Sequence, residues 1–287
     1  MNYIAFCDES YTSAERYRSI AVFSFKEKSL ETISKSLLTL LIKSDVKEFK
    51  WQKLRTAKYF FCAKHFTNYL LDSLEKEKIR IDVLTWDTKD SRHQVQSRDD
   101  SANFSRMFFH LLKNVLNKRE PSCRWKIYPD EKVDMDWNTL NDCLGAVGKW
   151  ERDSQSSLFN LSNDKLNYNI SEFEQKSSID FPCIHVSDLF AGLSVLSFKL
   201  YEKYKLWFKI KEGQLDLFNP QIVEKFSNSE EWRFKYLEYF LKVTERKKLG
   251  VSFEANKRLQ TFNPLNPINF WFYTPQHVND KAPIRES

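Results

Sequence analysis

Four acidic residues that are widely separated in the sequence are candidates for one shared site. They are Asp8 in YIAFCDES, Glu48 in EFKW, Asp130 in CRWKIYPDEK and Asp188 in HVSDLFAGLSVLSF. The ends of neighbouring strands, together with a crossing helix, can gather such carboxylates around two divalent cations. Mg²⁺ and Mn²⁺ prefer oxygen ligands, and a pair of such ions activates water and stabilises the leaving oxygen of a phosphodiester. The four acids therefore indicate metal-dependent phosphodiester hydrolysis, provided that the fold brings them together.

Each of the first three acids also has an ordinary structural interpretation. Asp8 shares a face with Ile4 and Phe6 in an alternating strand, so it should lie at the strand end, but it could be a turn or capping acid. Asp130 follows Pro129, which should end its strand, so Asp130 could also be an ordinary turn residue.

Two of these acids have charged residues close by in the sequence. Asp134 and Asp136 could take the place of Asp130. Glu48 and Lys50 are two residues apart, so in an extended segment both would point the same way, and they could form a surface ion pair of little energetic value.

The fourth acid, Asp188, is harder to explain as a surface residue. In a helix it shares one face with Ala191, Gly192 and Val195. The small residues on that face would let the helix approach a sheet closely. An acid that faces the protein interior is costly unless it is paired or binds a metal. His185, three residues before Asp188, could orient it or assist proton transfer.

The elements that must position these residues alternate between strands and helices over the first 200 residues. Apolar periodicity predicts strands over 3–8 and 18–25 as an antiparallel pair, over 78–87 and 123–130, and an edge strand within LNYNISEFEQKSS. It predicts helices over 29–43, 57–77, 99–118 and 136–150, and one behind Pro182 through IHVSDLFAGLSVLSFKLYEKY. This alternation indicates an α/β fold with a mixed sheet flanked by helices.

The character of the chain changes after Tyr204. Residues 205–250 are rich in aromatic residues and lysine, with one predicted helix over about 229–247 that Gly250 stops. The tail NPLNPINFWFYTPQ is expected to pack back on the body. We therefore divide the chain into a core, 1–204, and a C-terminal helical, aromatic-rich extension, 205–287.

Composition limits the class of protein. The formal net charge of +6 permits an anionic partner such as nucleic acid. No run approaches the ~20 apolar residues of a membrane span, and the N-terminus does not resemble a secretion signal. The five cysteines are scattered, with no Cys-x-x-Cys pair. This spacing argues against a zinc site or disulfide scaffold and favours a reducing, cytoplasmic location.

The four acidic motifs, taken in order, resemble the domain-of-unknown-function 3800 family. That family opens with a strand ending in Asp-Glu-Ser, has a Glu-x-Lys element and a later strand ending in Asp, and closes with a helix like Gln-x-Ala-Asp-x-x-Ala-Gly. The corresponding segments here are YIAFCDES, EFKW, KIYPDEK and HVSDLFAG, within residues 1–204. Tyr11 departs from the family's usual Gly, and His185 and Ser187 replace its usual Gln and Ala.

The resemblance implies a ribonuclease H-like fold and a metal-dependent nuclease of the kind often found near mobile or defence genes. It implies Asp8, Glu48, Asp130 and Asp188 as ligands of Mg²⁺ or Mn²⁺, with Glu9, Ser10 and Lys50 as neighbours.

Three functions remain open. In a nuclease that cuts RNA or DNA, Lys50 could contact the scissile phosphate, and Trp51 with Lys53 and Arg55 could form a stacking and phosphate-binding rim. The alternatives are a catalytically silent nucleic-acid-binding module, or a subunit whose aromatic segment INFWFYTPQ docks a protein partner.

Overall fold

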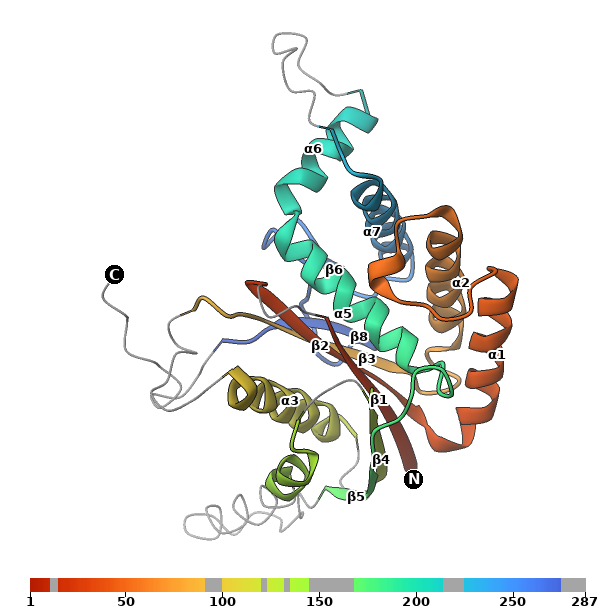
Figure 1. Ribbon diagram of the computed structural model, residues 1–287, viewed down its shortest axis with the longest axis vertical. Coiled ribbons are helices and arrows are strands. Elements are labelled where there is room, and N and C mark those ends of the chain that lie inside the picture. Colours follow the sequence, from red (N-terminus) through yellow and green to blue (C-terminus); the bar gives the residue numbers. More distant parts are fainter. Residues whose placement is uncertain are drawn as a thin grey trace.

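A mixed six-stranded sheet forms the centre of the computed structural model, which describes residues 1–10, 15–90, 100–119, 123–131, 135–144, 168–213 and 225–274. The strand order is β5-β4-β1-β2-β3-β8 (Figure 1). Its strands are β1 (Asn2–Ser10), β2 (Tyr17–Lys26), β3 (Arg80–Asp87), β4 (Arg124–Pro129), β5 (Asn169–Phe173) and β8 (Ile268–Phe272). β1, β2 and β3 pair antiparallel, whereas β4, β5 and β8 each run parallel to a neighbour. The predicted α/β class, the antiparallel first pair and the edge position of β5 are confirmed.

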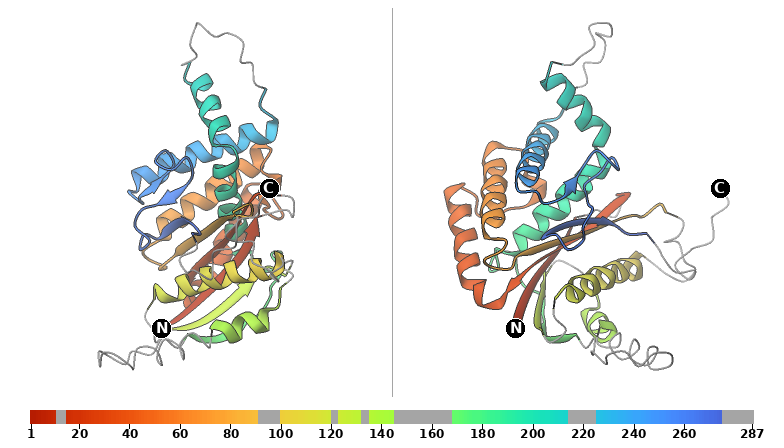
Figure 2. Two further views of the ribbon diagram at one scale, coloured as in Figure 1. Left: turned by 90° about the vertical axis from the view of Figure 1, so that its left-hand side faces the viewer. Right: turned by 180° about the vertical axis from the view of Figure 1, so that it is seen from behind.

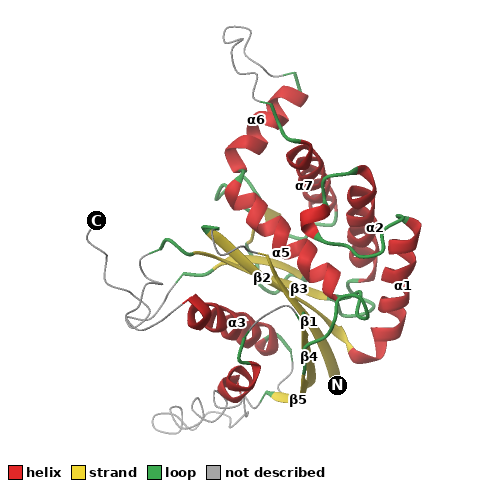
Figure 3. Ribbon diagram, in the orientation of Figure 1, coloured by secondary structure: helices red, strands yellow, loops and turns green. Residues whose placement is uncertain are grey.

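Helices cover both faces of this sheet (Figures 2 and 3). On one face lie α1 (Leu30–Lys43), α2 (Ala57–Ser73), α5 (Ile184–Lys199) and α7 (Asn228–Arg246), and on the other lies α3 (Asp100–Asn117). The alternation along β1 separates the two cores, since Ile4 and Phe6 join the first and Ala5 and Cys7 join the second. Asp8 continues the first set, and its side chain is therefore directed to the α5 face.

Helix α5 is buried around its whole circumference from Ile184 to Ser197. Two hydroxyl groups attach it to the sheet: the Ser187 Oγ donates to the Phe6 carbonyl at 2.9 Å, and the Ser19 Oγ donates to the Ala191 carbonyl at 2.6 Å. The predicted single helix through Tyr204 is interrupted at Leu200, after which α6 (Tyr201–Lys211) begins.

The other predicted helices occur with shifted ends. Helix α2 ends at Ser73 rather than 77, and residues 137–144 are helical, while 145–150 lie outside the described residues. Helix α7 ends at Arg246, and the chain already turns at Lys248, with φ of 53°, so Gly250 is not the residue that stops it.

The C-terminal segment adds more to the fold than a helical extension. β8 pairs with β3 inside the central sheet, and Ile268 and Phe270 are fully buried. The boundary expected at 204 falls inside α6. The apolar side of INFWF that carries Ile268 and Phe270 therefore completes the core.

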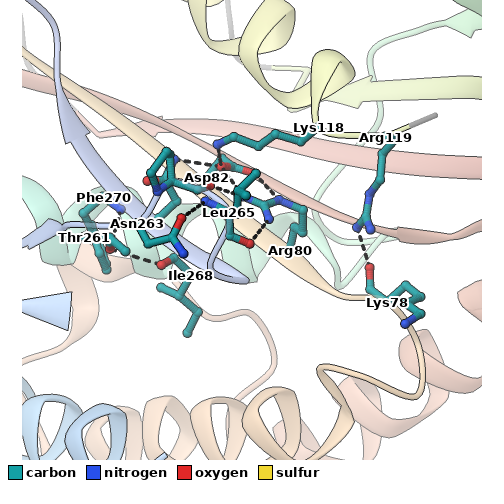
Figure 4. Close-up of polar contacts among 12 residues, drawn as sticks. Lys78, Arg80, Asp82, Lys118, Arg119, Thr261, Asn263, Leu265, Ile268 and Phe270 are labelled. Carbon is teal, nitrogen blue, oxygen red and sulfur yellow. Dashed lines mark hydrogen bonds and ion pairs between the residues drawn. The ribbon is translucent and has the colours of Figure 1, made fainter. Parts of the chain in front are cut away.

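A buried polar network fixes this C-terminal strand (Figure 4). Asp82 on β3 is fully buried and accepts hydrogen bonds from Arg80, from Lys118 at 2.6 Å and from Asn269 at 2.9 Å. The two cations lower the pKa of Asp82 against the opposing effect of its burial. The Asp82 carboxylate thus joins β3, the end of α3 and β8.

Among the described residues, no helix is long and apolar enough to cross a membrane.

Candidate functional site

One cavity of about 480 Å³ contains all five residues that the sequence singled out: Asp8, Glu48, Lys50, Asp130 and Asp188. They come from a strand end, an extended loop, a second strand end and a helix. Positions as distant as 8 and 188 therefore share one solvent-connected space.

Asp8 and Asp130 are neighbours because β1 and β4 are adjacent and parallel. Cys7 lies opposite Pro129, and the backbone N–H of Asp130 donates to the Cys7 carbonyl at 2.9 Å. Pro129 ends β4, but pairing extends one residue further, since Asp130 forms an isolated bridge with Lys176. Asp8 and Asp130 are 5% and 2% exposed, so both carboxylates have lost most of their hydration.

Asp188 enters the cavity from α5 and is held by a backbone group. Its Oδ2 accepts a hydrogen bond of 2.6 Å from the backbone N–H of Trp51. This contact connects the helix to the segment that carries Glu48 and Lys50, and it orients Asp188 without a side-chain cation.

Lys50 lies among the acids. Its Nζ is 3.3 Å from Asp130 Oδ2 and 3.6 Å from Glu48 Oε1, so Glu48 and Lys50 do point the same way. Glu48 also accepts a hydrogen bond from the Ser178 Oγ at 3.1 Å and lies 3.7 Å from the Lys53 Nζ. The pair is therefore part of a charged cluster rather than an isolated surface ion pair.

The electrostatics of the cluster show an excess of negative charge. Burial, followed by repulsion from Asp188 and Glu9, raises the pKa of Asp8 well above its usual range. Burial also raises the pKa of Asp188 to about 6 and that of Glu9 to about 7. Burial acts to lower the pKa of Lys50, but the surrounding carboxylates outweigh it and the pKa is raised. The ammonium groups of Lys50 and Lys53 do not neutralise the carboxylates of the cluster, so a further cation would relieve their repulsion.

The residues fit a divalent metal by donor type. The buried Oδ1 of Asp130 and Oε2 of Glu9 have no hydrogen-bond partner among the described residues, although buried oxygens normally have one. Hard cations take such oxygens as ligands. The side chains are not already placed as a coordination shell: within the described residues, no group of three or more His, Cys, Asp or Glu is arranged to hold a metal ion. The Lys50 ammonium lies between the carboxylates instead.

The remaining residues that the sequence suggested for the site differ in whether they line the cavity. Glu9 and Ser10 line the cavity. His185 is 1% exposed, and burial lowers its pKa to about 4, so it is neutral at pH 7. Asp136 is exposed and accepts hydrogen bonds from Thr139 at the start of the helix 137–144, where it acts as a cap. Asp134 lies outside the described residues.

The sequence did not indicate Arg233, which lines the same cavity from α7. Its Nη2 lies 3.4 Å from the Trp51 carbonyl and 3.5 Å from the Gln52 carbonyl, and its guanidinium stacks 5.3 Å from the centre of the Trp51 ring. Burial lowers its pKa, and no carboxylate of the described residues lies within ion-pair distance. No local pattern could have found this residue, because its partners are more than 180 positions away.

Trp51 itself is a core residue. It is 6% exposed and packs between the backbone of Gly192 and the side chains of Arg233 and Tyr236. The prediction that Trp51 forms part of an exposed stacking rim is therefore wrong. The expectation that Gly192 brings α5 close to the sheet is corrected too, since the close approach at Gly192 is made by the indole ring.

Two relatives show which proteins this chain is similar to. No family model matches the chain. The uncharacterized proteins ORF2' and ORF2 of Methanothermobacter thermautotrophicus are 37% and 36% identical to it, over 99% of this chain and 98% of each relative. The similarity thus extends over nearly the whole length of the chain and of each relative. The chain therefore belongs to the family of these ORF2 proteins.

Proposed function

We propose that this protein is a metal-dependent nuclease with a ribonuclease H-like fold, related to the domain-of-unknown-function 3800 family, that hydrolyses phosphodiester bonds of RNA or DNA. One observation carries the proposal: Asp8, Glu48, Asp130 and Asp188 line a single cavity although they come from four distant parts of the chain. The mixed sheet with helices on both faces, and the two acids at adjacent ends of β1 and β4, support it.

In this proposal the four carboxylates would hold Mg²⁺ or Mn²⁺, and the metal would supply an activated water and charge stabilisation at the leaving oxygen. The residues of the chain have separate tasks. Lys50 exchanges its present carboxylate partners for a substrate phosphate, and Arg233, which lines the same cavity from α7, is a second phosphate contact. The Trp51 N–H orients the Asp188 carboxylate. Cations that approach the phosphate also stabilise its developing charge.

The experiment is a cleavage assay with end-labelled and circular RNA and DNA, single- and double-stranded, in Mn²⁺, Mg²⁺ or EDTA. Wild type is compared with Asp8→Asn and Asp188→Asn, and with Asp136→Asn as a matched control outside the cavity. We expect cleavage that requires metal, persists in Asp136→Asn and falls by a factor of at least about 10² in the two cavity variants. Cut circles would show endonuclease activity. Cleavage that survives in EDTA or in both cavity variants would refute the proposal.

One observation favours a second candidate, a catalytically silent nucleic-acid-binding module. The Lys50 ammonium lies between the carboxylates and could replace a metal permanently. This candidate predicts metal-independent binding that weakens steeply with salt, together with no cleavage under any of the metal conditions.

A further inference from the structure

A second cavity, of about 670 Å³, lies beside the acidic cavity where α5 meets α6. Residues 256–258 also line it, and Lys199 and Leu200 line both cavities. The two cavities therefore adjoin at these two residues. We call the second one the basic groove, and its remaining lining residues are Tyr17, Phe198, Tyr201, Glu202, Lys203 and Leu206.

The groove has the charge opposite to that of the acidic cavity. Four cations line it, Lys199, Lys203, Lys257 and Arg258, against the single acid Glu202. Each groove lysine has a carboxylate partner: the Lys199 Nζ is 2.6 Å from Glu15, the Lys203 Nζ is 2.7 Å from Glu230, and the Lys257 Nζ is 3.2 Å from Glu202. The Lys257–Glu202 pair is the most exposed of the three, and exposed ion pairs contribute only ~0–1 kcal/mol. A phosphate group can therefore replace the Glu202 carboxylate at Lys257 at little cost.

Aromatic rings line the groove together with the cations. The rings of Tyr17 and Phe198 are 5.2 Å apart, and the Arg258 guanidinium lies 5.4 Å from the centre of Phe198. Phe198 stacks on Phe272 and Tyr201 packs on Phe253, so the core fixes both half-buried rings, and each lines the groove with its remaining surface. Rings and cations together are the combination that binds single strands, since bases stack on rings while phosphates contact lysine and arginine.

A cavity of similar volume elsewhere on the protein does not have this combination of cations and rings. A third cavity of about 630 Å³ on α1 and α2 is lined by Glu31, Thr32, Lys35, Ser36, Thr39, Leu40 and Tyr69. It contains one cation, one acid and one ring. Its Lys35 is therefore a matched control position for the basic groove.

We propose that the basic groove binds a single-stranded stretch of nucleic acid and leads it to the acidic cavity. This proposal rests on the proposed function, because the strand would be the substrate. A duplex would not satisfy the rings, since its bases are already stacked. The groove contacts are with phosphates and ring faces, which DNA and RNA share, so both should bind. The phosphates of a single strand are negatively charged, so one strand could contact the cations of the groove and also Lys50 and Arg233 in the acidic cavity.

The test is fluorescence anisotropy with a labelled single strand in EDTA, so that binding is measured without cleavage. Lys257→Glu and Lys257→Glu/Arg258→Gln are compared with wild type and with Lys35→Glu. We expect the double variant to bind DNA and RNA strands about tenfold more weakly, with a shallower salt dependence, and Lys35→Glu to bind as wild type does. Because Arg258 packs on Phe198, Lys257→Glu is the safer variant for folding and should still weaken binding about threefold.

Three results would refute the proposal that the basic groove binds a single strand. They are unchanged affinity in folded Lys257→Glu and double variants, duplex binding as tight as single-strand binding, and equal competition by polyglutamate, which would indicate an acidic protein instead. Hydrolysis of the small diester bis(p-nitrophenyl) phosphate by wild type with Mn²⁺ tests the proposed function separately. Hydrolysis with unchanged strand binding in the variants refutes only the groove. Groove-dependent binding without any hydrolysis of diester or strand refutes only the nuclease.

Discussion

Gly192 on α5 offers a sharp test of how the site is held. A Cβ built at this position would overlap the Cγ, Cδ1 and Cδ2 atoms of the Trp51 indole, far inside ordinary carbon–carbon contact distance. The indole cannot easily withdraw, because the Arg233 guanidinium lies 5.3 Å from its centre on one side and Tyr236 packs against its edge. Gly192→Ala must therefore displace Trp51 or shift α5.

The magnitude follows from two opposing effects. Alanine is favoured over glycine in a helix interior by ~1 kcal/mol, whereas overpacking a dense core costs ~1–3 kcal/mol and sometimes more. The overlap involves three ring atoms in a fully buried helix, so the steric cost should exceed the propensity gain. We expect Gly192→Ala to lower the free energy of unfolding by about 1–2 kcal/mol.

The assay is urea unfolding of a double-mutant cycle. Trp51→Ala alone should cost ~3–5 kcal/mol, because a large buried ring is lost. In that background the overlap is absent, so Gly192→Ala should become neutral or stabilising by up to ~1 kcal/mol. The sign of the Gly192→Ala effect thus depends on whether Trp51 is present. If Gly192→Ala were as stable as wild type with Trp51 in place, the close contact that we describe would be wrong.

Three further changes test the charged groups. Asp82→Ala leaves the buried cations Arg80 and Lys118 uncompensated and should lower the free energy of unfolding by ~3–5 kcal/mol, and a cost below ~1 kcal/mol in urea unfolding would contradict the network. Asp8→Asn removes like-charge repulsion, so at pH 8 without metal it should be more stable than wild type by ~1 kcal/mol. It should also lose the rise in melting temperature that Mn²⁺ gives wild type, and an equal rise in both proteins would exclude Asp8 as a ligand. Glu9 has a folded pKa of about 7, above its usual value, so the stability it contributes is present at low pH and is lost as the pH rises through 7. Without metal, the free energy of unfolding of Glu9→Gln should therefore increase relative to that of wild type by up to ~1.4 kcal/mol per pH unit between pH 5 and 7. If the free energies of unfolding of the two proteins changed in parallel with pH, this prediction would be contradicted.

Local sequence patterns determined the elements and the direction of their side chains. The alternation in YIAFCD predicted that Asp8 lies on the face of Ile4 and Phe6, and the structure places Ile4 and Phe6 in the core beneath α5. Periodicity predicted most helices, because a buried stripe every three to four residues is a property of the chain itself. The ends were less well predicted, since turns such as that at Lys248 adopt a positive φ without a glycine.

The long-range partners could not be predicted in this way. Nothing in INFWF says that it pairs with β3, because an apolar strand is compatible with any sheet edge, and the Asp82 network that fixes it depends on residues up to 187 positions apart. For the same reason, the local sequence could not show whether Trp51 is a core residue or an exposed platform. It also could not place Arg233 beside Trp51, because that position depends on how α7 packs on the core.

The sequence by itself determined the acidic residues, their order and the strands and helix that carry them, since residue type and periodicity are local properties. Only the tertiary structure decided that the four acids share one cavity with cations such as Lys50 and Arg233, and that a second cavity with more cations than acids adjoins it. The physical reason is that charge and packing act across space. The cluster depends on which strands are neighbours and on how closely α5 crosses them, and neither is written in any single stretch of the chain.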